Sequence, residues 1–272
     1  MDPVREAAEL IGRARRLVVF TGAGMSAESG IPTFRDALTG LWARFDAEAL
    51  ATPEAFERDP ALVWGWYEGR RAAVERVRPN AGHEAIARRD CTVITQNVDD
   101  LHERAGSADV VHLHGSLFTP RCSVCATPAV PPAAPGGSAG ATSAGATSAG
   151  AMSAGAMSAG AAPAVLPGGD EGPIEPPACA VCGAAVRPGV VWFGEQLPAE
   201  AFERAVDAAA HCDVLLTVGT SALVYPAADL PWVAARSGGA VIQVNPQPTP
   251  LDPICAVSLR APAAAVLPEI IS

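Results

Sequence analysis

A buried strand that runs directly into a glycine turn is the feature that most constrains how this chain can fold. Residues 17–21 (LVVFT) are apolar or β-branched, and Gly22, Ala23 and Gly24 follow at once. This order predicts a strand, a tight turn and the first turn of a helix. Glycines let the backbone of such a turn approach a pyrophosphate, whose charge the helix amides can hold. The turn alone leaves a nucleotide site undecided, because many glycine turns bind nothing.

Further apolar runs predict more strands of the same sheet. They alternate with helical stretches, and they are apolar throughout rather than at every second position. Such strands are typical of a parallel sheet covered on both faces, so we predict an α/β fold with a Rossmann-like, doubly wound parallel sheet. Polar clusters follow the strands, as expected for a ligand site at their carboxyl ends. Strands are predicted at residues 17–21, 91–95, 109–113, 213–219, 240–245 and 256–259, an extended segment at 190–193, and helices at 3–16, 39–78, 80–89, 198–210, 226–237 and the C-terminus. Within 39–78, helices should start at Thr52-Pro53 and at Asp59-Pro60, where a cap residue precedes a proline.

Length and composition narrow the class of protein. With 272 residues and 49% hydrophobic content, the chain can bury one large core, or a large and a small one. No run of about 18 uncharged apolar residues is present, and charges interrupt the N-terminus where a signal peptide needs an apolar core. We expect a cytoplasmic protein without a membrane span, and we expect it to be monomeric. The net charge of −10 argues against a nucleic-acid partner held through its phosphates.

The composition changes abruptly at about residues 126–178. Residues 138–162 are five tandem pentads, SAGAT twice, SAGAM twice and SAGAA, built mainly of small residues and with proline and glycine runs on either side. A segment without apolar anchors cannot offset the entropy cost of ordering. We expect this low-complexity insert to be a disordered loop.

Two C-x-x-C pairs indicate a metal site. Cys122 with Cys125, and Cys179 with Cys182, can each supply two thiolates to a tetrahedral zinc. The alternatives are two unrelated turns or a redox dithiol, and the absence of catalytic surroundings favours zinc. A closed four-sulfur site has no open coordination position. This zinc should therefore stabilise a small domain and take no part in chemistry.

The residues after the glycine turn carry a specific resemblance. The run GAGMSAESGIPTFR (22–35) resembles the signature of the sirtuins, the NAD-dependent protein lysine deacylases. TQNVDDLH and HLHG, the latter ending at Gly115, resemble two further sirtuin segments. The resemblance implies a Rossmann-like NAD-binding domain at 1–120 and 186–272, with a helical insertion at about 39–78. It places a small zinc-binding domain between these parts, at 121–185, containing the low-complexity insert.

The resemblance also implies a chemical role for His114, which would be the general base. The residues themselves allow this, since an imidazole at a strand end can take a proton from a ribose hydroxyl, although such histidines are more often structural. Asn97 and Asp99 would line the nicotinamide ribose and complete the catalytic set. Gln247 departs from the family pattern, in which an acidic residue is frequent at this position, two residues after the asparagine that matches Asn245. The implied contacts to NAD are Gly22, Ala23, Gly24, Ser26, Glu28, Phe34, Arg35, Gln96, Asn97, Asp99, Gly219, Thr220, Ser221, Asn245, Gln247 and Ala263.

The expected partner is an acylated lysine side chain of another protein. Tyr67 and Arg70 are spaced i, i+3 on an expected helix and share a face. Sirtuins that remove succinyl, malonyl and glutaryl groups carry such a pair, and a guanidinium beside a phenol suits a distal carboxylate. The alternative is an arginine that packs beside a half-buried tyrosine. The resemblance implies substrate contacts from Tyr67, Arg70, Val191, Phe193, Gly194, Glu195 and Val224.

Four functions therefore remain in view. The leading one is NAD-dependent removal of succinyl, malonyl and acetyl groups from protein lysines, which produces nicotinamide, 2′-O-acyl-ADP-ribose and free lysine. The others are a deacetylase without carboxyacyl preference, a mono-ADP-ribosyltransferase, and a catalytically silent NAD-sensing or zinc-ribbon module. The presence of Asn97, Asp99 and His114 together argues against the silent module.

Overall fold

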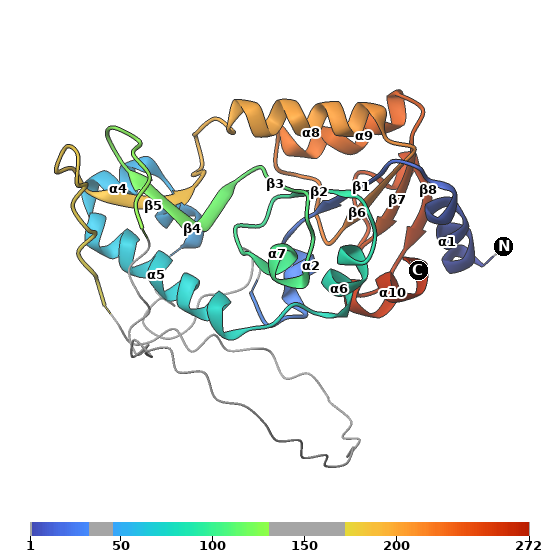
Figure 1. The fold of residues 1–272 in the computed structure, drawn as a ribbon, viewed down its shortest axis with the longest axis horizontal. Coiled ribbons are helices and arrows are strands. Elements are labelled where there is room, and N and C mark those ends of the chain that lie inside the picture. The colour runs from blue at the N-terminus through green and yellow to red at the C-terminus, as the bar shows by residue number, and fades with distance from the viewer. Residues whose placement is uncertain (1, 33–45, 131–171, 272) are drawn as a thin grey trace, which may run out of the picture.

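A parallel sheet forms the centre of the molecule. The computed structural model describes residues 2–32, 46–130 and 172–271. Within them, the strands follow the order β3-β2-β1-β6-β7-β8, and every neighbouring pair is parallel (Figure 1). From β1 the chain adds β2 and β3 toward one edge of the sheet, and from β6 it adds β7 and β8 toward the other edge. Doubly wound sheets bind ligands at such a switch point, here between β1 and β6. The strands are β1 (Leu17–Thr21), β2 (Thr92–Thr95), β3 (Val110–His112), β6 (Val214–Val218), β7 (Ala240–Val244) and β8 (Cys255–Leu259).

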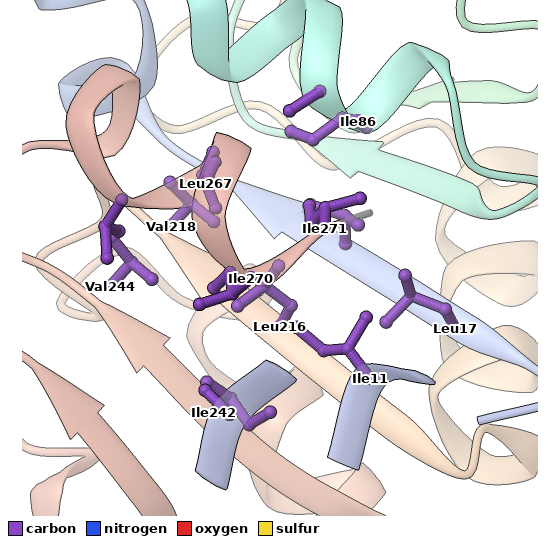
Figure 2. Close-up of a cluster of buried hydrophobic side chains, with 14 of the residues drawn as sticks. Ile11, Leu17, Ile86, Leu216, Val218, Ile242, Val244, Leu267, Ile270 and Ile271 are labelled. Atoms are coloured by element: carbon purple, nitrogen blue, oxygen red, sulfur yellow. The ribbon is translucent and has the colours of Figure 1, made fainter. Parts of the chain in front are cut away.

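Helices cover both faces of this sheet, which confirms the predicted doubly wound fold. On one face, Ile11 and Ile270 pack with Leu216 of β6 in a core of buried aliphatic side chains (Figure 2). On the other face, Ala205 and Leu230 pack against further residues of the same strands. The first face is covered by α1 (Pro3–Arg13), α6 (Ala81–Ala87) and α10 (Ala263–Ile270), and the second by α8 (Ala199–His211) and α9 (Leu230–Arg236).

A smaller lobe lies beside the sheet and has its own core (Figure 1). Its two-stranded antiparallel sheet pairs β4 with β5, and three helices pack with it. Capping residues begin two of these helices as the sequence predicts: Thr52 Oγ1 accepts a hydrogen bond from Ala55 N, and Asp59 Oδ1 accepts one from Leu62 N. The elements are α3 (Ala47–Leu50), α4 (Pro53–Arg58), α5 (Pro60–Arg76), β4 (Gly115–Cys122) and β5 (Val186–Val190).

The predicted extended segment at 190–193 overlaps the observed strand only at Val190, and it is wrong at Phe193, which lies in a turn. β5 ends at Val190, and the following residues form a turn in which Glu195 N donates to Trp192 O. The Glu195 carboxylate also accepts a hydrogen bond from Trp192 N at 2.8 Å, which closes the turn. β4 was not predicted at all. Its partner strand lies more than sixty residues later in the chain, so neither strand has a local pairing signal.

Most of the low-complexity insert, including all five pentads, lies outside the described residues. Its two ends are placed. Pro128 bridges to Arg121, Ala178 bridges to Ala185, and Ile174 N donates to Ala61 O at 2.9 Å. Residues 126–130 and 172–178, which the composition assigns to a disordered loop, are thus placed by contacts with the rest of the chain.

Short helices complete the described chain. Among the residues that the structure places, none of the helices has both the length and the apolar character that crossing a bilayer requires. The remaining elements are α2 (Ala23–Ala27), α7 (Leu101–Ala105) and the 3₁₀ helices η2 (Ala227–Asp229) and η3 (Asp252–Ile254).

Candidate active site at the carboxyl edge of the sheet

Two glycine turns meet backbone to backbone beyond β1 and β6. Gly24 N donates to Gly219 O at 2.8 Å, and Gly22 N donates to Val218 O at 3.0 Å. A Cβ on Gly24 would lie 2.8 Å from Gly219 Cα, and a Cβ on Gly219, whose φ is +60°, would lie 2.3 Å from Met25 N. Glycine is therefore required at these positions by the packing of one turn on the other. The backbone amides that begin α2, from Ala23 onward, receive no side-chain cap.

A buried polar cluster lies next to these turns. Ser26 Oγ donates to Asp99 Oδ2 at 2.9 Å, and Asn97 Nδ2 donates to Ser26 Oγ at 3.0 Å. All three side chains are less than 8% exposed. Burial raises the pKa of Asp99, while hydrogen bonds from Leu101 N and Ser26 oppose this shift. The structure therefore brings together Ser26, Asn97 and Asp99, three of the residues expected to contact NAD.

Gln96 joins the two halves of the site. Its Nε2 donates to Thr220 Oγ1 at 2.9 Å, and the same Oγ1 accepts a hydrogen bond from Ala222 N. Gln96 follows β2, whereas Thr220 and the neighbouring Ser221 follow β6. This contact holds the loops on either side of β1 in one arrangement.

The two ring nitrogens of His114 have different roles: Nδ1 is hydrogen-bonded within the chain, and Nε2 could accept a proton. Its Nδ1 lies 2.9 Å from Gln96 O, and because a carbonyl can only accept, this nitrogen carries the proton in the neutral ring. The Nε2 atom then has the lone pair that a general base needs. Burial lowers the pKa of His114, so the ring is neutral at pH 7.

The neighbouring histidines are engaged within the chain. His112 contacts Asn97 O and Glu103 Oε1, the second at 2.6 Å. Burial acts to lower the pKa of His112, but Glu103 outweighs it and the net shift is upward. His102 Nε2 lies 3.1 Å from Thr21 Oγ1, and burial lowers its pKa to about 3. Both histidines are therefore hydrogen-bonded to groups of the chain itself.

The expected adenosine end of the site uses several of its polar groups internally. Asn245 Nδ2 donates to Gln247 O at 2.7 Å, and Arg260 donates to the same carbonyl. Glu28 Oε2 accepts a hydrogen bond from Ala264 N at 2.7 Å, beside the buried Ala263. The Glu28 carboxylate therefore caps α10 and ties it to the glycine turn. Phe34 and Arg35, also expected here, lie outside the described residues.

Tyr67 and Arg70 lie on one face of α5, as their spacing predicts. Tyr67 is buried, and its Oη accepts a hydrogen bond from Trp192 Nε1 at 3.1 Å. The guanidinium carbon of Arg70 lies 5.2 Å from the Trp66 ring centroid. Burial raises the pKa of Tyr67 to about 12 and lowers the pKa of Arg70. A phenol and a cation thus stand together in an apolar setting, where electrostatic interactions are strong.

The segment after β5 runs beside the catalytic histidine candidate. Val191 N donates to His114 O at 2.9 Å, and Phe193, 46% exposed, is anchored through its N–H to Ala51 O. Val224, on the loop after β6, is 40% exposed. Gly194 has a φ of +86°, which the turn requires. Exposed apolar side chains on two separate loops could contact an extended peptide.

Glu195, an expected substrate contact, is hydrogen-bonded within the chain. Its two oxygens accept hydrogen bonds from Arg187 at 2.6 and 2.8 Å, and one of them also accepts from Trp192 N. These bonds fix the Glu195 carboxylate inside the turn. Arg187 and Trp192, which hold this carboxylate, are not among the residues expected from the sequence, although they lie beside Val191, Phe193 and Gly194 in the chain.

The four cysteines of the two C-x-x-C pairs converge at the end of the smaller lobe. Their sulfur atoms all lie within 4.8 Å of one another, with Cys122 to Cys182 at 3.4 Å and Cys125 to Cys179 at 3.7 Å. Four sulfurs bound to one zinc at about 2.3 Å would lie about 3.8 Å apart. The cluster therefore fits a structural zinc, as the sequence predicts.

Two proteins named as NAD-dependent protein deacylases are similar to this chain over nearly its whole length. "NAD-dependent protein deacylase" of Methylococcus capsulatus is 52% identical over 261 residues, which cover 94% of this chain and 91% of that protein. "NAD-dependent protein deacylase 1" of Pseudomonas aeruginosa is 52% identical over 274 residues, which cover 98% of each.

Solved structures share the fold as well as the sequence. A crystal structure of a Sir2 homologue in complex with NAD matches with a TM-score of 0.80 and 42% identity, covering 98% of this chain and 92% of that one. A complex of Sir2 with a p53 peptide and NAD⁺ matches with a TM-score of 0.73 and 27% identity, covering 98% and 96%. The sequence model of the Sir2 family matches residues 22–226. This chain belongs to the Sir2 family.

Proposed function

We propose that this protein is an NAD-dependent protein lysine deacylase that prefers carboxyacyl groups such as succinyl and malonyl. The observation that carries the activity is the His114 ring, whose Nδ1 is fixed by Gln96 O next to the Ser26, Asn97 and Asp99 cluster. The family membership and the names of the similar proteins support NAD as the co-substrate.

The proposed reaction uses these side chains in two stages. The acyl oxygen of the modified lysine displaces nicotinamide from the ribose of NAD, and the glycine turns hold the pyrophosphate while this happens. His114 Nε2 then takes the proton of a ribose hydroxyl, whose oxygen attacks the acyl carbon. The lysine amine is protonated and leaves, a water molecule adds to the acyl carbon that now bridges the two ribose oxygens, and the bond from this carbon to the 1′-oxygen breaks. The acyl group therefore remains on the 2′-oxygen of ADP-ribose. Asn97 and Asp99 orient the ribose, and Ser26 keeps both side chains in place.

The acyl preference rests on Tyr67 and Arg70. A succinyl or malonyl group ends in a carboxylate, which an acetyl group lacks. A guanidinium and a phenol O–H can both donate to that carboxylate, and charge-assisted hydrogen bonds are roughly twice as strong as neutral ones. The buried setting of the pair favours a ligand that brings the opposite charge.

Steady-state kinetics on matched acetyl- and succinyl-lysine peptides test this proposal. The wild-type protein with NAD should release nicotinamide and acyl-ADP-ribose from both peptides, with the larger kcat/KM on the succinyl peptide. Arg70→Met should lower kcat/KM for the succinyl peptide about tenfold or more, because one charge-assisted hydrogen bond contributes about 1.5–3 kcal/mol. The acetyl peptide should be affected far less. Because the chain contains no lysine, every acyl-lysine in the assay comes from the peptide.

Arg76→Met is the matched control, since it removes an arginine from the end of the same helix. It should leave the ratio of the two kcat/KM values unchanged. Equal losses on both peptides in Arg70→Met would contradict the acyl preference. Release of nicotinamide with transfer of ADP-ribose to the peptide, and no loss of its acyl group, would favour a mono-ADP-ribosyltransferase.

A further inference from the structure

Trp192 contacts Tyr67 from outside helix α5. Its indole Nε1 donates to Tyr67 Oη at 3.1 Å, and the two side chains are only 3% and 4% exposed. Tyr67 comes from the middle of α5, whereas Trp192 comes from the turn after β5, next to the residue that bonds His114 O. One buried hydrogen bond therefore joins the proposed acyl-reading helix to the segment beside the proposed base.

This hydrogen bond decides what the Tyr67 hydroxyl can do. A phenol has one proton to donate, and its oxygen can accept as well. Since the Trp192 N–H approaches the oxygen, the proton of Tyr67 must point away from Trp192. Within the described residues, no hydrogen bond uses that proton. Burial raises the pKa of Tyr67 to about 12, so the proton stays in place at neutral pH.

Trp192 is itself held on two sides. The guanidinium carbon of Arg187 lies 3.4 Å from the centroid of its ring, and Glu195 accepts a hydrogen bond from its backbone N–H. Arg187 and Glu195 form a two-pronged ion pair, with distances of 2.6 and 2.8 Å. Such pairs fix direction as well as distance. The indole cannot rotate away from Tyr67 without leaving this contact.

We propose that Trp192 is a positioning residue for acyl selectivity, which directs the Tyr67 O–H toward the distal carboxylate of a carboxyacyl-lysine beside the Arg70 guanidinium. The inference rests on the proposed function. It identifies the contact that distinguishes a lysine carrying a short dicarboxylic acyl group from an acetyl-lysine. An acetyl group offers no acceptor at that place, so its removal does not depend on the direction of the phenol proton. Trp192 acts through Tyr67 and does not touch the substrate.

Trp192→Phe removes the N–H donor and keeps an aromatic ring over Arg187. The KM for the succinyl peptide should rise about 5- to 10-fold, since the net contribution of one hydrogen bond is up to about tenfold in affinity. Its kcat, and both constants for the acetyl peptide, should change less than about twofold. Trp64→Phe is the matched control, because Trp64 is an equally buried indole on α5 that does not bond Tyr67. It should leave the two KM values in their wild-type ratio.

A double variant tests whether Trp192 works through the phenol. Tyr67→Phe with Trp192→Phe should bind the succinyl peptide no more weakly than Tyr67→Phe alone. Additive losses, or equal losses on both peptides, would overturn the inference. If Trp192→Phe unfolds early, 3-benzothienylalanine at position 192 replaces the N–H by sulfur with nearly the same shape and takes its place in every comparison.

Fluorine NMR observes the hydrogen bond without any turnover. The chain has only two tyrosines, Tyr67 and Tyr225, so 3-fluorotyrosine gives two signals, and Tyr225→Phe assigns them. Trp192→Phe should shift the Tyr67 signal and leave that of the exposed Tyr225 in place. An unchanged Tyr67 signal would overturn the inference. A wild-type protein that removes no succinyl groups would overturn the proposed acyl preference and this inference together, whereas normal succinyl removal by Trp192→Phe would overturn the inference alone.

Discussion

At the scale of the residue, the imidazole of His114 is prepared by two effects that act on different atoms. The carbonyl of Gln96 holds the proton on Nδ1, and the buried setting disfavours the charged ring. The first effect orients the lone pair of Nε2, and the second keeps that lone pair available as the pH falls. Ser26, Asn97 and Asp99 nearby are hydrogen-bonded to one another, and these two effects are the reason why we propose His114 as the base.

The pH dependence of deacylation should therefore show an acidic limb below the ordinary histidine pKa. Because burial lowers the pKa of His114 from 6.5, the base is protonated only in more acidic solution. We expect kcat/KM to be constant above pH 6.5 and to fall as the pH drops below it, when measured with an acetyl peptide at saturating NAD. His114→Ala should lower kcat by at least about 100-fold and leave NAD binding, measured by calorimetry, within about threefold. A limb centred above 6.5, or an active His114→Ala variant, would contradict the assignment of His114 as base.

At the scale of the element, the smaller lobe depends on its cysteines more than the sheet does. β4 and β5 form only a two-stranded pair, which is marginal in water without further support. Cys122 ends β4, and the second C-x-x-C pair lies just before β5, so one zinc would close the open end of this pair. The helices α3 to α5 cover the other end through the apolar core around Trp66 and Trp192.

Removal of the metal should therefore destabilise the smaller lobe. After chelation, we expect a separate thermal transition at lower temperature, by about 10 °C or more, because metal binding contributes directly to folding. Cys182→Ser should behave like the chelated protein, and Cys255→Ser, outside the cluster, should keep one zinc and the wild-type melting curve. For the chelated protein and for each cysteine variant, mass spectrometry measures the metal content and circular dichroism measures the melting curve. Unchanged melting after complete loss of metal would rule out the structural role.

At the scale of the whole molecule, two buried histidines link stability to pH. His83 on α6 and His102 on α7 are almost fully buried, with ring centroids 4.8 Å apart. Burial lowers their pKa values to about 4 and about 3, and among the residues that the structure describes neither His83 Nε2 nor His102 Nδ1 has a hydrogen-bond partner. Both rings are neutral in the fold. In the unfolded chain they would bind protons at a pKa of about 6.5.

The free energy of unfolding should consequently fall as the solution is acidified. Below pH 6.5 the unfolded chain binds more protons than the fold, so stability decreases by up to about 1.4 kcal/mol per pH unit for each histidine, until the folded-state pKa is reached. Urea denaturation at pH 7 and pH 5 measures this difference, which we expect to be about 2–4 kcal/mol. His83→Gln should reduce it by nearly half. Because both proteins keep the cysteine cluster, acid release of metal cancels in the comparison, and equal pH dependence of the two would refute the link.

Local patterns in the chain were enough to predict the elements whose cause lies in neighbouring residues. Continuous apolar runs specified the six parallel strands, cap residues followed by Pro53 and Pro60 specified the starts of α4 and α5, and the C-x-x-C spacing specified a four-sulfur site. It also placed Ser26, Asn97 and Asp99 together, since carboxyl ends of parallel strands share one edge.

The tertiary structure alone decided the contacts between distant segments. Nothing local in β4 and β5 indicates that they pair, because antiparallel partners more than sixty residues apart leave no turn signal. The same holds for Glu195, which looks like a site carboxylate in sequence but is bound by Arg187, and for Trp192, whose partner Tyr67 lies 125 residues away. Such bonds depend on side-chain directions that only the assembled core defines, so chain-local propensities cannot specify them.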